Sequence, residues 1–149
     1  MIRIRNMTRA DIVQVSKIEE ETFSSPWSAD SFVDSLGRKD AIYIVACEDE
    51  CIVGYCGLYN IVNEGNINNV AVSKLFRGQQ IGFLMLTRLI ELGNAQNIEA
   101  YTLEVRRSNE AAIKLYEKLK FIKEGIRKNF YNNPNEDAII MWYRLNKVV

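Results

Sequence analysis

The centre of the chain carries a strand, a helix and a second strand in direct succession, and this unit constrains the fold more than any other feature. Residues 66–72 (NINNVAV) predict the first strand, and residues 100–105 (AYTLEV) predict the second. Between them, apolar and small residues recur at helical spacing from Gly82 to Gly93. Two strands that are joined by one helix lie parallel in the same sheet, with a right-handed crossover. We therefore predict an α/β chain in which these two strands are parallel neighbours.

The segments on both sides of this unit predict further strands, with helices between them. Thr8 and Ser28 are suitable N-caps for two helices after the first strand. Trp27 can pack on Phe32 across the second cap. Apolar spacing predicts another helix over residues 108–120. The remaining predicted strands cover residues 2–5, 41–48, 51–59, 121–128 and 138–145. The predicted order of elements is βααβββαβαββ.

Length and composition limit the class of protein. With 149 residues, of which 48% are hydrophobic and 26% charged, the chain has an ordinary globular composition, and we predict one domain over residues 1–149. Lys and Arg balance Asp and Glu at 19 each, which argues against direct binding of nucleic acid. No run approaches the ~20 apolar residues that span a bilayer, and the N-terminal residues turn polar before a secretory signal could form. We therefore expect a cytoplasmic protein without a membrane partner.

The chain contains no histidine, which excludes several chemistries at once. Ser-His-Asp and Cys-His activation of a nucleophile both need an imidazole, and so does every zinc site built on histidine. The three cysteines, Cys47, Cys51 and Cys56, lie in apolar segments that predict strands, which favours reduced, buried thiols over a metal site. We expect no metal, and acid–base chemistry must then use carboxylate, Tyr, Lys, Cys or water.

A loop between the first central strand and the helix carries Arg77, Gly78 and Gly82. Free N–H groups at the start of a helix bind anions such as a pyrophosphate, with help from the helix dipole. The same spacing also suits a tight turn with a packing glycine. The loop is not a Walker motif, because no Gly-Lys-Ser/Thr follows it.

Four segments of the chain resemble the GNAT superfamily of N-acetyltransferases. Residues 70–82 resemble its acetyl-CoA-binding motif, in which the pattern Gln/Arg-x-x-Gly-x-Gly/Ala begins a helix. The other segments are FSSPWS (23–28), TLEVRRSNEAAIKLYEKLKF (102–121) and EDAIIM (136–141). The resemblance implies the GNAT fold, a mixed and mostly antiparallel sheet with a splayed central parallel pair and flanking helices. It also implies acetyl-CoA as the cosubstrate.

The resemblance also assigns roles to individual residues. Glu104 matches the general base of the family and Tyr116 its general acid. The residues that match coenzyme A-binding positions are Val70, Ala71, Val72, Arg77, Gly78, Gln79, Gln80, Ile81, Gly82 and Asn109. The alternation with Leu103 turns the Glu104 side chain toward a cleft or toward solvent, so a solvated strand carboxylate is the alternative. For Tyr116 the alternative is a core tyrosine with a hydrogen-bonded hydroxyl.

The acceptor is implied only by the resemblance, which points to the branch that acetylates the N-terminal alanine of a ribosomal protein. Trp27 and residues 129–136 resemble regions that shape the peptide groove, although they also suit an ordinary core and turn. A small-molecule amine or a lysine side chain remains an alternative acceptor. A non-catalytic acyl-CoA-binding module is a third possibility, against which the presence of both Glu104 and Tyr116 argues.

Two residues depart from the family pattern, which has glycine in their places. Gln80 lies in the pyrophosphate loop, and Lys120 precedes Phe121. A residue with a Cβ avoids positive φ. Either Gln80 is already helical, with its N–H free for phosphate, or the loop is strained and binds the cofactor less tightly. We predict the first, and we predict that Lys120 ends the helix of residues 108–120.

Overall fold

The computed structural model describes residues 1–145, which form a seven-stranded mixed sheet with four α-helices. In chain order the elements are β1 (Ile2–Asn6), the 3₁₀ turn η1 (Arg9–Asp11), α1 (Ile12–Thr22), α2 (Ala29–Leu36), β2 (Ala41–Glu48), β3 (Cys51–Ile61), β4 (Glu64–Val72), the 3₁₀ turn η2 (Lys74–Phe76), α3 (Ile81–Ala95), β5 (Ala100–Arg106), α4 (Glu110–Lys118), β6 (Ile122–Tyr131) and β7 (Glu136–Arg144). The predicted order of strands and helices is confirmed.

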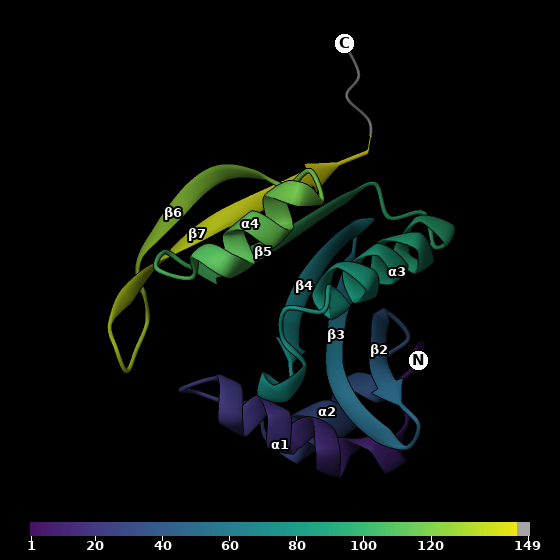
Figure 1. The fold of residues 1–149 in the computed structure, drawn as a ribbon. Coiled ribbons are helices and arrows are strands. Elements are labelled where there is room, and N and C mark those ends of the chain that lie inside the picture. Colours follow the sequence, from purple (N-terminus) through teal and green to yellow (C-terminus); the bar gives the residue numbers. More distant parts are fainter. Residues whose placement is uncertain (146–149) are drawn as a thin grey trace.

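The strand order across the sheet is β1-β2-β3-β4-β5-β7-β6, and within residues 1–145 only the β4–β5 pair is parallel. This pair is short, because Glu64–Asn66 pairs with Ala100–Thr102 and the two strands then diverge. Figure 1 shows the resulting division of the sheet into a β1–β4 half and a β5–β7–β6 half. The prediction of a mostly antiparallel sheet with a splayed parallel pair is confirmed.

Helices cover both faces of the first half of the sheet and one face of the second. α1 and α2 pack on one face of β2, β3 and β4, while α3 packs on the other. β2 and β3 are therefore buried on both faces and are apolar along most of their length. α4 lies over the second half on the α3 side, where Ile113 and Tyr116 join the core formed by Leu103, Ile139 and Met141.

The predicted cap of α2 is confirmed, whereas the predicted cap at Thr8 belongs to the 3₁₀ turn η1, and α1 itself begins after Asp11. The Ser28 hydroxyl accepts a hydrogen bond from the Ser31 N–H at 3.2 Å, at the start of α2. Trp27 packs on Phe32, with the ring centroids 5.3 Å apart. Before α1, Asp11 accepts the Thr8 N–H at 2.8 Å, which fixes the turn that follows β1.

The conformations predicted for Gln80 and Lys120 are wrong. Gln80 has φ 62° and ψ 21°, so it is left-handed and lies just before α3. Lys120 has φ 77° and lies beyond the end of α4 at Lys118. In both places the chain turns sharply at a helix end, and it keeps the left-handed geometry that glycine adopts freely although the side chain carries a Cβ. The departures from the family pattern therefore change the residue but leave a glycine-like backbone.

Candidate active site

The divergence of β4 and β5 opens a cavity of about 300 Å³ beside the parallel pair. Within residues 1–145, β4 beyond Asn66 pairs only with β3, and β5 beyond Thr102 pairs only with β7. Each strand thus presents one backbone edge to the gap. The residues that line the cavity are Glu64, Asn66, Ile67, Asn68, Thr102, Leu103, Glu104, Arg127, Ile140 and Trp142.

Glu104 lies in this cavity, as the alternation of β5 predicts. Its side chain is 31% exposed, and Oε2 lies 2.7 Å from Nε of Arg127. Oε2 itself is buried and accepts no hydrogen bond from any group in residues 1–145. The Glu104 carboxylate is therefore held by charge but keeps unused acceptor capacity at the edge of the gap.

Arg127 was not among the residues predicted from the sequence. It lies on β6, with β7 between it and Glu104, since Arg127 pairs with Ala138 and Glu104 with Ile140. A contact across an intervening strand depends on the register of three strands, which no local pattern reveals.

Tyr116 projects from α4 into the core on the other side of the sheet. It is 7% exposed, and desolvation by burial raises the pKa of its phenol well above the usual range. Tyr116 does not line the cavity that contains Glu104.

Tyr131 lies at the end of β6, and its pKa responds to the charge of Glu104. Burial first, and then the negative charge of Glu104, raise the pKa of Tyr131 to about 12. The proximity of Tyr131 also contributes to the raised pKa of Tyr116.

The loop before α3 has the geometry of an anion site. Gly78 has φ 82°, and a Cβ built on it would meet no atom within 4 Å, so this glycine is needed for its conformation and leaves open space. The first turn of α3, IGFL, contains no acidic side chain. Nε of Arg77 donates to the carbonyl of Val72 at 3.1 Å, which ties the loop to the end of β4. Free N–H groups at this helix start suit a pyrophosphate.

Asn109 has a structural role that the family pattern does not imply. It is the N-cap of α4, and its Oδ1 accepts the Ala112 N–H at 3.2 Å. The helix therefore starts at Glu110, two residues later than predicted, because the cap occupies position 109. The side chain is exposed, and its contact with coenzyme A stays a prediction.

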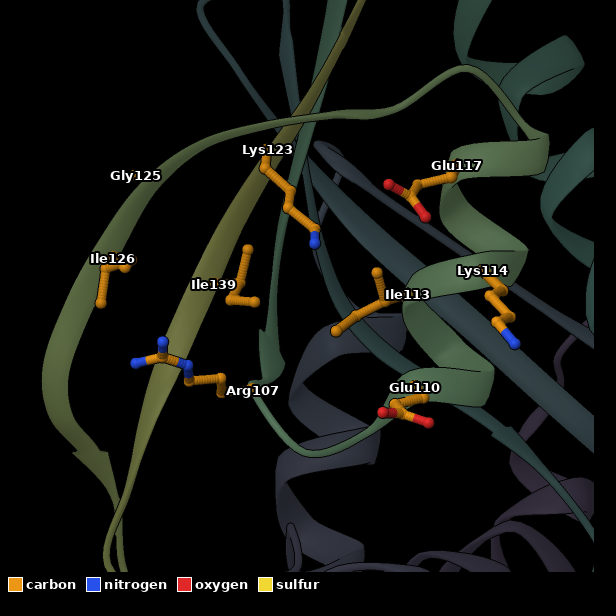
Figure 2. A pocket seen from close by; sticks show the side chains of 9 residues that line it. All are labelled: Arg107, Glu110, Ile113, Lys114, Glu117, Lys123, Gly125, Ile126 and Ile139. Atoms are coloured by element: carbon orange, nitrogen blue, oxygen red, sulfur yellow. The ribbon is translucent and has the colours of Figure 1, made fainter.

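A larger cavity, about 770 Å³, lies between α4 and the strands β6 and β7. Figure 2 shows Ile113 from α4 facing Ile139 from β7 across it, with Lys123 above and charged side chains of α4 at its rim. It contains none of the residues predicted for catalysis or for cofactor binding. Ile139 and Ile140 point to opposite faces of β7, so this cavity lies on the face opposite to Glu104.

Two of the three cysteines are buried in the sheet. Cys47 and Cys56 are buried, as predicted, but Cys51 is exposed, because it lies at the first position of β3 beside the hairpin turn. Within residues 1–145 no cluster of three metal-ligating side chains occurs. No helix in the same range is long and apolar enough to cross a membrane.

Comparison with known proteins identifies the class. Residues 12–121 match the model of the acetyltransferase (GNAT) family, so the chain belongs to the GNAT family and is an N-acetyltransferase. Members of this family use acetyl-CoA as the acetyl donor.

Within this family the chain closely resembles RimI, the ribosomal protein bS18-alanine N-acetyltransferase. It is 39% identical to the putative [ribosomal protein bS18]-alanine N-acetyltransferase of Bacillus subtilis, over 97% of this chain and 96% of that protein. It is 31% identical to the [ribosomal protein bS18]-alanine N-acetyltransferase of Salmonella typhimurium, over 95% and 96% of the two chains. The crystal structure of the ribosomal-protein-S18-alanine N-acetyltransferase from Escherichia coli superposes with a TM-score of 0.90 at 28% identity, and covers 100% of this chain and 97% of that one.

Proposed function

We propose that this chain transfers the acetyl group of acetyl-CoA to the N-terminal α-amine of a protein, namely the N-terminal alanine of ribosomal protein bS18 in the cytoplasm. The observation that carries the proposal is the gap between β4 and β5. The cavity in this gap holds a partly exposed carboxylate, Glu104, whose Oε2 accepts no hydrogen bond from the described residues, and the opposite face of the sheet holds a buried phenol, Tyr116. The resemblance to bS18-alanine acetyltransferases over almost the whole chain supports the acceptor.

Glu104 serves as the general base in this proposal. An amine attacks a thioester only when it is neutral, and an α-amine with pKa ~8 loses its proton at pH 7 for about 1.4 kcal/mol. A lysine with pKa ~10.4 needs about 4.6 kcal/mol. A carboxylate that removes the proton directly or through a water meets the smaller demand, so Glu104 suits an N-terminal acceptor better than a lysine.

Tyr116 serves as the general acid. Because burial raises the pKa of its phenol, Tyr116 stays protonated at working pH. In this proposal the departing thiolate takes up that proton. Thiolate is a fair leaving group, with pKa ~8.5, so this proton should contribute less than the positioning of the amine. The amine nitrogen bonds to the carbonyl carbon as the carbon–sulfur bond breaks, and no acyl-enzyme is required.

The cofactor is proposed to enter the gap along the free edge of β4. Backbone groups of Val70, Ala71 and Val72 pair with the pantetheine arm, and one N–H there polarises the thioester carbonyl. The loop of residues 77–82 receives the pyrophosphate, with Gly78 leaving room for it. Asn109 contributes from the start of α4.

Mass spectrometry of the intact acceptor tests the proposal. Purified enzyme is incubated with acetyl-CoA and bS18, and then with bS18 in which the N-terminal alanine is blocked. We expect a gain of one acetyl group only on the protein with the free N-terminus. Acetylation of the blocked protein would place the acceptor on a lysine side chain and contradict the proposal.

A panel of acceptors separates the alternatives. Peptides that start with alanine, peptides with a blocked N-terminus and a lysine, and small primary amines are compared by kcat/KM. Faster turnover of a small amine or a lysine peptide would identify a different acceptor class. Binding of acetyl-CoA without turnover of any amine would identify a non-catalytic acyl-CoA-binding module.

A further inference from the structure

The Arg106 side chain joins two segments that lie far apart in the sequence. Nη2 donates to Oγ of Ser24 at 3.1 Å and to the carbonyl of Asn132 at 2.9 Å. Nη1 donates to the carbonyl of Pro134 at 2.9 Å and to Oε1 of Glu136 at 3.2 Å. One guanidinium thus connects the segment after α1 with the loop between β6 and β7.

Other contacts reinforce the same connection. The Ser24 hydroxyl donates to the carbonyl of Asn132 at 3.1 Å, so the two segments also bond to each other. The Tyr131 ring lies under the guanidinium, with Cζ of Arg106 4.5 Å from its centroid. Glu136 accepts the Ser108 N–H in addition to the Arg106 guanidinium. The side chain of Ser108 is the main cause that lowers the pKa of Glu136, and the Ser108 N–H and Arg106 lower it further. Glu136 is therefore charged at neutral pH and balances the arginine.

The position of Arg106 places this connection beside the proposed base. Glu104 and Arg106 are two residues apart on β5, so their side chains leave the same face of the strand, ~7 Å apart along it. α1 and α2 cover this face over β2, β3 and β4, whereas over β5 and β7 it is bordered by residues 23–28 and 132–136. The two joined segments therefore lie beside the face from which Glu104 is reached.

We propose that Arg106 is a positioning residue that holds residues 23–28 and 132–136 together as one frame for the acceptor N-terminus next to Glu104. The inference rests on the proposed reaction, because it assigns the acceptor to the face that carries Glu104. Arg106 touches no reacting atom in this scheme. It sets the distance between the two segments and thereby the width of the entry.

The four hydrogen-bond acceptors around the Arg106 side chain require an arginine. Two main-chain carbonyls, a hydroxyl and a carboxylate oxygen surround one planar group, and the fork of a guanidinium donates to all four at once. A lysine has three donors on one nitrogen and cannot reach both segments in the same geometry. Lys at this position would keep the charge but release at least one segment.

Kinetics and hydrogen exchange of Arg106→Lys and Arg106→Gln test the proposal, with Arg107→Gln as the matched control. Arg107 is the next residue, and its single ion pair is with Asp137 at 3.6 Å. For both Arg106 variants we expect the acceptor KM to rise at least about fivefold, the scale of one net hydrogen bond, with the acetyl-CoA KM within about twofold. Amide exchange should rise in residues 23–28 and 132–136 together. The control should change neither quantity.

Ser24→Ala provides a milder variant, because it removes only the hydroxyl contacts. In Ser24→Ala, amide hydrogen exchange should rise in the same two segments, but by less than it does in Arg106→Gln. An Arg106 variant with faster exchange in both segments but an unchanged acceptor KM would overturn the proposal, and so would faster exchange in only one segment. The KM is measured with the amine that the wild-type enzyme acetylates fastest. A failure of bS18 as acceptor would therefore refute the proposed function, while the acceptor KM of the Arg106 variants would still test the role of Arg106.

Discussion

At the scale of single residues, the proposed base Glu104 lies in the cavity beside the parallel pair and keeps an unused acceptor atom, Oε2. Glu104→Gln keeps the shape of the side chain and removes its basicity, so kcat/KM should fall at least about tenfold at pH 7. The loss should shrink toward pH 9, because more of the acceptor amine is then already neutral. The measurement is a pH profile of kcat/KM for both enzymes. Glu64→Gln is the control, since Glu64 lines the same cavity from β4, and an equal loss there would remove Glu104 from the role of base.

The environment of Tyr116, the proposed acid, favours the neutral form of its phenol, because burial raises the pKa. Tyr116→Phe deletes only the hydroxyl, and we expect a lower kcat with little change in acetyl-CoA affinity. Because burial raises the pKa of the phenol, the defect should have the same size at pH 7 and pH 9. Single-turnover kinetics and titration with acetyl-CoA measure the two quantities. If affinity fell while kcat held, Tyr116 would be a binding residue.

Gln80 carries a strain that the family pattern avoids. A left-handed residue with a Cβ costs ~1 kcal/mol, so Gln80→Gly should stabilise the protein by about that amount in denaturant unfolding. The backbone already has the glycine-like conformation, and acetyl-CoA affinity should therefore change by less than about fivefold, or roughly 1 kcal/mol. Titration of both proteins decides the second point. An affinity gain well beyond tenfold would show that the Gln80 side chain obstructs the pyrophosphate.

At the scale of elements, α3 and α4 end in the same way. After α4, the Phe121 N–H bonds to the Tyr116 carbonyl and the Lys120 N–H to the Glu117 carbonyl, both at 2.9 Å, which is a Schellman motif with Lys120 left-handed. After α3, Asn97 has the corresponding place, with φ 66°. The Phe121 ring then packs on Tyr116, with the centroids 6.0 Å apart. The end of α4 thus fixes the backbone and the ring of the proposed acid.

Lys120→Gly should stabilise the protein by about 1 kcal/mol, because glycine adopts the left-handed conformation without the penalty of a Cβ. Asn97→Gly is the comparison, and its gain should be smaller, since asparagine tolerates this conformation better than lysine. Urea unfolding of the three proteins measures both differences. A loss of stability in Lys120→Gly would mean that the aliphatic part of the lysine contributes more than the backbone strain costs.

The elements were predictable where one local pattern decides them. β2 was predicted with its observed bounds, because its apolar run is flanked by turn residues on both sides. The helix of residues 108–120 was predicted two residues too long at each end, since the cap at Asn109 and the left-handed Lys120 depend on backbone geometry. Alternation along β5 was enough to turn Glu104 toward the gap. The contacts of Arg106 and Arg127 join segments distant in sequence, and no local pattern reveals them.

At the scale of the whole molecule, the sheet consists of two halves with few direct links. Three residue pairs join β4 to β5, and beyond them the strands diverge (Figure 1). On the face that carries α3 and α4, the start of α3 touches α4, since a Cβ on Gly82 would lie 3.0 Å from Cδ2 of Leu115. On the opposite side, Arg106 joins the two halves through Ser24. A ligand that fills the gap between these links should tie the halves together.

Acetyl-CoA should therefore stabilise both halves at once. At a concentration of 100 Kd it should add about 2.7 kcal/mol to the free energy of unfolding, because it binds only the folded state. Amide exchange should slow along the gap-facing edges of residues 67–72 and 103–106, as well as in the loop of residues 77–82. ADP is the control, because it carries a pyrophosphate but no pantetheine arm, and it should slow exchange in the loop alone. If acetyl-CoA also protected only the loop, the pantetheine arm would lie outside the gap. Glu104 would then be too far from the thioester to remove the proton of the attacking amine.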